Sequence, residues 1–398
     1  MIPAARLELL NAAYERHFGM RRRDAYLIVT PGRVNLIGEH IDYNGLAVLP
    51  MAIQRNITLL SSPRADAAVT VANTSAEFGT RNFEVESEIE PFPAGDWGNY
   101  VKAAVQALAG RFGAGRGFDA VLDSDVPVAA GLSSSSALLV ATALAFVTAN
   151  DIVVQPLELM ELAAEAERYV GTRGGGMDQA VCLGAVEQAA LRVDFNPLRL
   201  TPRQIPAEWR FVVISSRQRA EKSGAARDTY NQRTRECREA LESVLGHLDL
   251  PAGVDSYAGL LGEAGAPKLL EGGDRVLGGT LRRRFRHVVT EAHRVNEAEA
   301  AMAAADLGGF GHVLTESHAS LRDDYDVSTP ELDEIVETAV AAGAQGARLT
   351  GAGLGGCAVA VCSEEAAGSL VAELVARYRG EDQVFAAEPA GGASVTAL

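Results

Sequence analysis

The chain has 398 residues, a length that predicts two domains rather than one oversized hydrophobic core. Hydrophobic residues make up 47% of the chain and charged residues 22%, a composition typical of soluble globular proteins. The net charge of −16 argues against a nucleic-acid-binding protein, which needs a basic face, so an anionic ligand must be bound by local donors.

The four cysteines are Cys182, Cys237, Cys357 and Cys362, and none of them belongs to a CxxC pair. Their spacing suits neither a zinc site nor a disulfide framework, which predicts reduced thiols in a cytoplasmic protein. The N-terminal segment is amphipathic with charges throughout, unlike a signal peptide. No apolar run in the sequence approaches the length of a membrane span, and we therefore expect no membrane partner.

Apolar periodicity and turn residues predict the elements of the first half of the chain. The first strand is expected to end in a turn at Pro31-Gly32, because both residues favour turns. The expected elements are helices at 4–18, 99–111, 134–148 and 156–170, strands at 26–30, 46–53, 57–60, 118–122, 186–194 and 210–215, and a strand-rich region at 66–90.

Three prolines and several polar residues at 197–206 interrupt this pattern, and we place a domain boundary there. The boundary gives an N-terminal domain of residues 1–203 and a C-terminal domain of residues 204–398. Helices and strands alternate without a strict βαβ period, so the predicted fold class is α+β. Beyond the boundary, helices are expected at 229–245, 281–305 and 330–342, and strands at 346–349 and 357–362.

Residues 31–45 (PGRVNLIGEHIDYNG) concentrate polar groups in a short segment. Apolar residues and glycines separate Arg33, Glu39, His40 and Asp42, which fall within ten residues. Rigid donors and acceptors suit a polyol such as a sugar, because each hydroxyl needs a partner at a fixed geometry. The alternative is an ordinary strand and turn with surface charges, since short polar clusters are common on loops.

Residues 126–138 (VPVAAGLSSSSAL) form a small-residue loop that leads directly into an apolar helix. Backbone N–H groups of such a loop, together with the start of the helix, favour phosphate binding. The serines at 133–136 add hydroxyl donors and a candidate Mg²⁺ ligand, although a plain serine N-cap is the alternative. The chain contains no GxxxxGK[ST] sequence, and this loop does not match GxSxG, so it is neither a P-loop NTPase nor a good fit to a serine hydrolase.

Residues 351–356 (GAGLGG) satisfy the GxGxxG pattern of dinucleotide-binding proteins. Strand-like residues follow them, whereas a dinucleotide-binding fold needs a helix there. The pattern therefore predicts a hairpin whose backbone passes close to a ligand or another loop, with a simple tight turn as the alternative.

Residues 167–179 (ERYVGTRGGGMDQ) place a carboxylate behind three consecutive glycines. Asp178 could accept a proton from a hydroxyl or orient it, and Glu167, at the end of a predicted helix, could reach a metal ion. The alternative for Asp178 is a cap on the following helix.

Together these segments resemble the GHMP family of small-molecule kinases, and within it the galactokinase branch. Residues 31–45 look like the sugar signature of the family, residues 127–138 like its ATP-phosphate loop, and residues 348–357 like its third motif, which supports that loop. Residues 317–333 are similar to another galactokinase segment, and residues 97–102 resemble the adenine-pocket region. The motifs keep the family's order over nearly the whole chain, which favours the functional interpretation of each.

The resemblance implies an N-terminal domain similar to ribosomal protein S5 domain 2, a ferredoxin-like C-terminal domain, and ATP and sugar bound between them. It implies phosphorylation of a sugar's anomeric hydroxyl by ATP, with Mg²⁺ as cofactor. By position, Asp178 matches the catalytic carboxylate that faces this hydroxyl, and Arg33 matches the arginine that steadies the phosphoryl group. The matching sugar-binding positions are Glu39, His40, Asp42, Gly175 and Tyr230. The matching nucleotide-binding positions are Trp97, Gly131, Leu132, Ser133, Ser134, Ser135 and Ser136, and the matching metal ligands are Ser135 and Glu167.

The expected substrate is galactose, the commoner activity of this branch, and the protein is expected to act as a monomer. N-Acetylgalactosamine is the alternative: Ile41 stands where galactokinases commonly carry Thr, and residues 171–178 look closer to the N-acetylgalactosamine kinase sub-branch. Tyr230-Asn231, however, keep the pair of residues common in galactokinases. A non-catalytic galactose and ATP sensor is the third hypothesis, but its phosphate loop should be disturbed.

Overall fold

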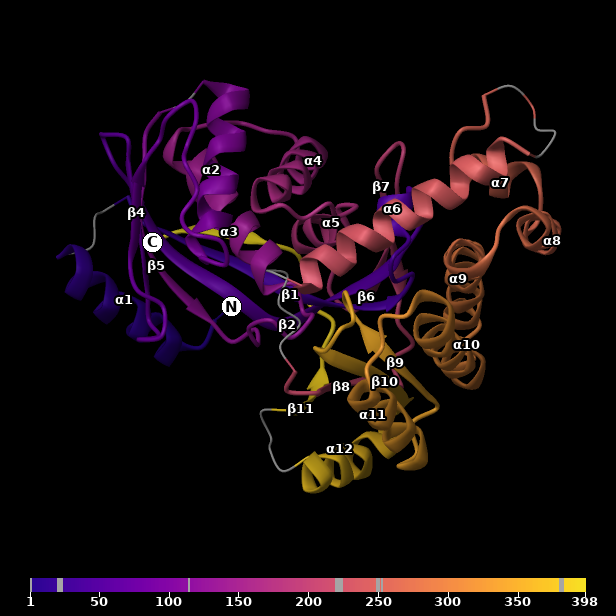
Figure 1. Ribbon diagram of the computed structural model, residues 1–398. Helices are drawn as coiled ribbons and strands as arrows, with labels where there is room; N and C mark the ends of the chain where they lie inside the picture. The colour runs from indigo at the N-terminus through magenta and orange to yellow at the C-terminus, as the bar shows by residue number, and fades with distance from the viewer. Residues whose placement is uncertain are drawn as a thin grey trace.

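The fold is seen in a computed structural model that describes residues 2–19, 24–113, 115–218, 225–247, 251, 253–378 and 383–398. Helices and strands are mixed along the chain, and the strands gather into two main sheets (Figure 1). This content confirms the predicted α+β class. No helix among these residues is both long and apolar enough to cross a membrane.

The first sheet has six described strands, and its two longest strands, β1 and β2, pair antiparallel. Only β3 and β5 pair parallel to each other. The last strand of the chain lies beside β1, so the C-terminus returns to the sheet in which the chain begins. In their order across the sheet, the strands are β12 (Ser394–Ala397), β1 (Tyr26–Ile37), β2 (Leu49–Pro63), β5 (Phe118–Ser124), β3 (Ala68–Asn73) and β4 (Arg81–Glu84).

Helices cover both faces of this sheet (Figure 1). On one face α1 buries Leu10 and Tyr14 in a cluster with Leu60 and Val121 of the sheet. On the other face α3 packs on β1 and β2, and α2, α4 and α5 pack around it. These elements are α1 (Ala4–Phe18), α2 (Gly98–Phe112), α3 (Ser134–Ala149), α4 (Pro156–Ala166), the 3₁₀ turn η2 (Glu167–Val170) and α5 (Met177–Gly184).

The second sheet is antiparallel and lies between helices. Alternate residues of its strands face opposite sides, so Phe211 and Val213 pack with α10 while Val212 and Ile214 pack with α11 and α12. In order, the strands are β11 (Val384–Ala387), β8 (Trp209–Ser215), β10 (Cys357–Ser363) and β9 (Gly346–Thr350), and the helices are α10 (Leu307–Ser320), α11 (Pro330–Ala341) and α12 (Glu364–Tyr378).

The remaining helices extend from the two sheets, with α6 and α9 packed against each other (Figure 1). The chain runs from α10 through one turn of π-helix, η3, before α11 begins. Their bounds are α6 (Ala225–Leu245), α7 (Tyr257–Glu263), α8 (Ala266–Val276), α9 (Gly279–Ala303) and η3 (Leu321–Tyr325).

The prediction of a turn at Pro31-Gly32 is wrong, because β1 continues through both residues to Ile37. The register of β1 against β2 shifts between Pro31 and Arg33, and a shift of this kind tolerates a proline. Here the Arg33 N–H donates to the Leu132 carbonyl at 3.1 Å. A Cβ on Gly32 would lie 3.0 Å from the same carbonyl oxygen, so the glycine permits this close approach.

The segment at 197–206, expected as a domain boundary, contains a strand. The strands β6 (Ala189–Asp194) and β7 (Arg199–Gln204) form an antiparallel hairpin. The strands expected separately at 46–53 and 57–60 are one strand, β2, whose polar residues Gln54 to Asn56 are its more exposed part. The division of the chain at residue 203 stays a prediction.

Candidate active site

Three of the predicted site segments, at residues 31–45, 167–179 and 351–356, meet at one pocket of about 440 Å³, a volume that includes its open mouth. The phosphate-loop residues Gly131 to Ser136 lie outside its lining. The pocket brings together eight of the residues that the sequence singled out, from β1 and the following loop, η2, α5 and α6. They are Arg33, Glu39, His40, Asp42, Glu167, Gly175, Asp178 and Tyr230.

One wall of the pocket is the loop that follows β1. Gly38 and His40 both have positive φ, at 99° and 64°, and this tight path turns the loop back across the pocket. The Gly175 N–H donates to Asp42 Oδ2 at 3.1 Å. A Cβ on Gly175 would lie only 2.3 Å from the Asp42 carbonyl carbon, so a side chain there would separate the two segments. Burial, together with the charge of Asp178, raises the pKa of Asp42 to about 6.

A buried ion pair between β1 and α5 also lines the pocket. Arg33 Nε donates to Asp178 Oδ1 at 2.8 Å, and Arg33 Nη1 donates to the Gly131 carbonyl at 2.5 Å. Burial disfavours the charge on Arg33, but the attraction of Asp178 and Glu39 outweighs it and the pKa of Arg33 is raised. One guanidinium therefore joins the candidate catalytic carboxylate to the candidate phosphate loop.

A cluster of oxygens lies next to this pair. The Ser136 hydroxyl donates to Glu167 Oε1 at 2.5 Å and lies 3.3 Å from Asp178 Oδ2. Mg²⁺ prefers oxygen ligands such as carboxylate and hydroxyl oxygens. In kinases it uses few protein ligands, because substrate phosphates supply the others. These residues therefore fit Mg²⁺ held together with a phosphate. Over the described ranges there is no cluster of three or more His, Cys, Asp or Glu that could enclose a metal by themselves.

The phosphate loop enters α3 through a left-handed residue. Gly131 and Ser133 have φ of 75° and 61°, and α3 begins at Ser134, with Ser135 half-buried in its first turn. Among the residues that the structure describes, the buried Ser133 hydroxyl has no hydrogen-bond partner and does not cap the helix. This observation counts against the plain N-cap. The first-turn N–H groups of a helix have no partners within it, which suits an anion.

The glycines at 351–356 support this loop from behind. β9 and β10 pair antiparallel with Thr350 opposite Cys357, which confirms the predicted hairpin. A Cβ on Gly351 would lie 2.5 Å from the Gly131 carbonyl oxygen, so the two loops pack backbone to backbone. Gly351 thus permits the close packing of these two loops, and it also lines the pocket.

His40 has both ring nitrogens bonded within the protein. Nε2 lies 3.1 Å from the Ala352 carbonyl and Nδ1 lies 2.9 Å from the Tyr43 hydroxyl. Because a carbonyl only accepts, Nε2 carries the proton and Tyr43 donates to Nδ1. Burial lowers the pKa of His40 to about 3, so the ring stays neutral. The Tyr230 ring lies 5.5 Å from it.

Trp97 lies outside the residues that line the pocket, just before α2. The Arg81 guanidinium lies 5.6 Å from its ring. Within the described part of the chain, the buried indole Nε1 has no hydrogen-bond partner. Its role in binding the nucleotide stays a prediction.

Several residues to which the sequence analysis assigned no individual role belong to the site or contact its residues. Thr172 and Gln179 line the pocket. Arg348 forms an ion pair with Glu39, and Glu291 accepts hydrogen bonds from the Gly38 and Glu39 N–H groups. The sequence did contain a sign that both charged residues are buried. Arg348 falls inside a predicted strand, and Glu291 falls on the apolar face of a predicted helix.

Comparisons with known proteins agree with this geometry. Three family models match: the galactokinase galactose-binding signature at residues 12–63, the GHMP kinases N terminal domain at 99–185, and the GHMP kinases C terminal at 298–380. A galactokinase from Chloroflexus aurantiacus is 38% identical over 378 residues, which cover 94% of this chain and 92% of the relative.

Two solved structures place the fold. A mevalonate kinase from Methanococcus jannaschii superposes with a TM-score of 0.61 at 20% identity, covering 92% of this chain and 98% of that chain. Together with the matches to the GHMP kinases N terminal domain and C terminal models, this likeness shows the two-domain GHMP kinase fold. A Lactococcus lactis galactokinase complexed with galactose superposes with a TM-score of 0.87 at 31% identity, covering 98% of this chain and all 100% of that chain. This protein belongs to the galactokinase family.

Proposed function

We propose that this protein is an ATP-dependent kinase that phosphorylates the anomeric hydroxyl of galactose to give galactose 1-phosphate and ADP. The observation that carries the proposal is the Arg33 guanidinium, which bonds Asp178 on one side and the Gly131 carbonyl on the other. The relative complexed with galactose supports the choice of sugar. The intact Arg33–Asp178 pair and phosphate loop count against a non-catalytic sensor.

Phosphoryl transfer needs positioning and charge stabilisation more than covalent help from the protein. Asp178 accepts a hydrogen bond from the anomeric hydroxyl and takes its proton as the new O–P bond forms. The bond between the γ-phosphorus and the bridging oxygen breaks at the same time, and ADP leaves. Arg33 stabilises the negative charge that spreads over the transferred phosphoryl group. Gly131, Leu132 and the loop serines Ser133 and Ser134 bind the phosphates, and Trp97 contacts the adenine.

We propose that Glu167 and Ser135 hold Mg²⁺, which neutralises charge on the β- and γ-phosphates when it is bound. The hydrogen bond from Ser136 supports this arrangement, because it fixes the orientation of the Glu167 carboxylate. Ser136 then acts as a positioning residue next to the metal, and Ser135 contributes the ligand oxygen.

The sugar contacts are assigned to the loop after β1 and to the residues that pack against it. Glu39, Asp42 and Tyr230 carry polar groups that line the pocket, and Gly175 presents its backbone there. His40 lies in the same loop but already has two partners, so its contribution to the sugar is its ring face and its backbone.

We also propose that the protein is a monomer in the cytoplasm, with domains at residues 1–203 and 204–398 and no nucleic-acid or membrane partner. All four cysteines are buried and none forms a disulfide, which agrees with a reducing compartment. The net charge of −16 agrees with the absence of a nucleic-acid partner.

The test is a coupled assay of ADP release with ATP, Mg²⁺ and separate sugars: galactose, N-acetylgalactosamine, arabinose and galacturonic acid. We expect the highest kcat/KM for galactose. A higher value for N-acetylgalactosamine would replace the substrate but keep the reaction. Turnover of only a uronic acid or arabinose would refute both sugars.

A further inference from the structure

An arginine lies directly behind the sugar-facing wall of the pocket. Arg348 of β9 has no exposed surface, and its Nη2 lies 2.9 Å from Glu39 Oε2. Its Nη1 donates to the carbonyls of Leu36 at 3.0 Å and Asn35 at 3.4 Å. One guanidinium thus binds the side chain of Glu39 and the end of β1 that carries it.

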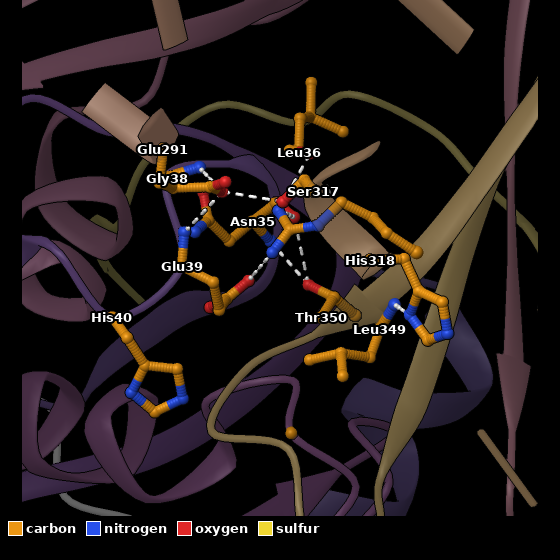
Figure 2. A network of polar contacts seen from close by, with 12 residues as sticks. Asn35, Leu36, Gly38, Glu39, His40, Glu291, Ser317, His318, Leu349 and Thr350 are labelled. Carbon is orange, nitrogen blue, oxygen red and sulfur yellow. Dashed lines mark hydrogen bonds and ion pairs between the residues drawn. The ribbon is translucent and has the colours of Figure 1, made fainter. Parts of the chain in front are cut away.

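The backbone around Glu39 is held from α9. The Gly38 and Glu39 N–H groups donate to Glu291 Oε1 at 3.0 and 3.3 Å (Figure 2). Ser317 and Arg294 donate to the same carboxylate, each at 2.7 Å. These contacts hold the main chain at Gly38 and Glu39, and the contact from Arg348 orients the Glu39 side chain.

Glu39 is the member of this network that reaches the pocket. It lines the pocket, whereas Arg348 and Glu291 do not. A carboxylate offers about four lone-pair sites, and the bond to Arg348 leaves others for a ligand. When an arginine holds one oxygen of a carboxylate, the orientation of the whole group is fixed. Its remaining lone pairs then accept hydrogen bonds from a fixed direction.

We propose that Arg348 is a positioning residue for sugar recognition, which holds the Glu39 carboxylate as the acceptor for one sugar hydroxyl. This inference rests on the proposed function. A hydroxyl donates to such an acceptor, whereas a carboxylate at the same position of the sugar would be repelled. The pair therefore selects neutral sugars over uronic acids.

Titration of Glu39 gives the pair a measurable signature. Burial raises the pKa of Glu39 to about 7, although Arg348, Arg33 and the nearby Asn35 side chain lower it, and Glu291 raises it. Burial lowers the pKa values of His287, which bonds the Glu39 carbonyl, to about 4 and of His40 to about 3, so neither ring changes charge near pH 7.

The pH dependence follows from these charges. Below its pKa Glu39 is protonated and is a poorer acceptor, so the KM for the sugar should rise as the pH falls through about 7. Removing Arg348 removes the largest influence that lowers this pKa, so the rise in KM should move to higher pH.

The experiment measures kcat, KM for galactose and KM for ATP between pH 6 and 9.5 in Arg348→Met and Arg348→Lys. At pH 7.5 we expect Arg348→Met to raise the galactose KM about 10- to 100-fold, with kcat and the ATP KM within about threefold, as loss of uniform binding requires. Arg348→Lys should recover part of the loss, and the penalty of Arg348→Met should shrink toward pH 9.5.

A double-mutant cycle assigns the effect to the pair. In a Glu39→Gln background, Arg348→Met should cost less than about threefold, because no charge remains to be held. Arg6→Met is the matched control. Arg6 is mostly buried and, like Arg348, bonds a carboxylate and a backbone carbonyl; the carboxylate belongs to Asp123, at 2.5 Å. Arg6 lies outside the pocket lining.

An equal fall in kcat with an unchanged galactose KM would overturn the inference, as would an unshifted pH profile or the same penalty in the Glu39→Gln background. If Arg348→Met does not fold, Arg348→Lys and the cycle built on it decide the matter. A wild-type protein inactive on galactose would refute the proposed function as well, whereas an active one indifferent to Arg348 would refute this inference alone.

Discussion

Two buried arginine–carboxylate pairs flank the pocket, and they differ in which partner reaches it. Arg33 and Asp178 both line the pocket, and the same arginine also bonds the Gly131 carbonyl of the phosphate loop. Arg348 lies behind the wall, and only its partner Glu39 lines the pocket. The same ion-pair chemistry can therefore face reacting atoms in one place and orient a binding group in another. The two pairs should fail differently when they are broken.

The largest effect is expected at Asp178. Asp178→Ala removes the acceptor for the anomeric proton, so kcat should fall about 10³-fold or more, near the upper range for general base catalysis. ATP binding, measured by calorimetry, should stay within about threefold. Asp123→Ala, which breaks an arginine pair far from the pocket, is the control. Unchanged turnover in Asp178→Ala would remove Asp178 from the mechanism.

The next effect is expected at Arg33. Arg33→Lys keeps a charge but cannot bond Asp178 and the Gly131 carbonyl with one planar group. We expect kcat to fall about 10²- to 10³-fold, the usual cost of losing a donor to a developing negative charge. Arg6→Lys controls for a general loss of stability. A change confined to the galactose KM would show that Arg33 binds the sugar rather than the phosphoryl group.

A smaller effect is expected at the serines near Glu167. Ser135→Ala removes the proposed ligand, so the Mg²⁺ concentration for half-maximal activity should rise about tenfold or more. Ser136→Ala only releases the Glu167 carboxylate and should raise that concentration less. Titration of Mg²⁺ after treatment with a chelator measures both values. The opposite order would make Ser136 the ligand.

The smallest expected effect concerns stability rather than catalysis. Burial raises the pKa of Glu291, but Arg294, Arg348 and His287 outweigh it and hold this pKa at about 2. The ionised carboxylate therefore contributes stability above about pH 4.5, roughly 3 kcal/mol, and this contribution disappears as the pH falls toward 2. Urea unfolding should show that Glu291→Gln is less stable at pH 7 and that the difference shrinks below pH 4.5. A difference independent of pH would contradict this origin.

The sequence predicts the site better than it predicts the elements around it. The polar segment at 31–45, the serine loop at 126–138 and Asp178 behind its three glycines lie close together in the structure. Each could be recognised from the sequence because its residue types and spacing are characteristic within a short segment. The prediction of a turn at Pro31-Gly32 is wrong because a contact with Leu132, about a hundred residues further along the chain, decides the local path of β1. Local propensity contains no information on such a partner.

The missed elements have similar causes. α10 contains three glycines, which lower its helix propensity. One of them is required by packing, because a Cβ on Gly311 would lie 2.3 Å from the Gln345 carbonyl oxygen. β12 consists of four exposed residues, and it forms a strand because it pairs with β1 near the other end of the chain. Its own sequence does not reveal that partner.

The chemistry of individual residues also depended on the fold. The sequence placed His40 with the sugar, but its ring bonds Tyr43 and Ala352, which lies more than 300 residues away. Arg348 and Glu291 were missed for the same reason. A charged residue in a predicted strand or on an apolar helix face indicates a buried partner, but the sequence does not say which one.

The most direct test is a galactose titration of the wild type, Arg33→Lys and Arg348→Lys side by side, with the product identified by ³¹P NMR. We expect the wild type to form galactose 1-phosphate, Arg33→Lys to lose kcat, and Arg348→Lys to raise the galactose KM while keeping kcat. A wild type that does not phosphorylate galactose at the anomeric oxygen would contradict the proposed function. Two variants with the same pattern of loss would contradict the division of work between the two arginines.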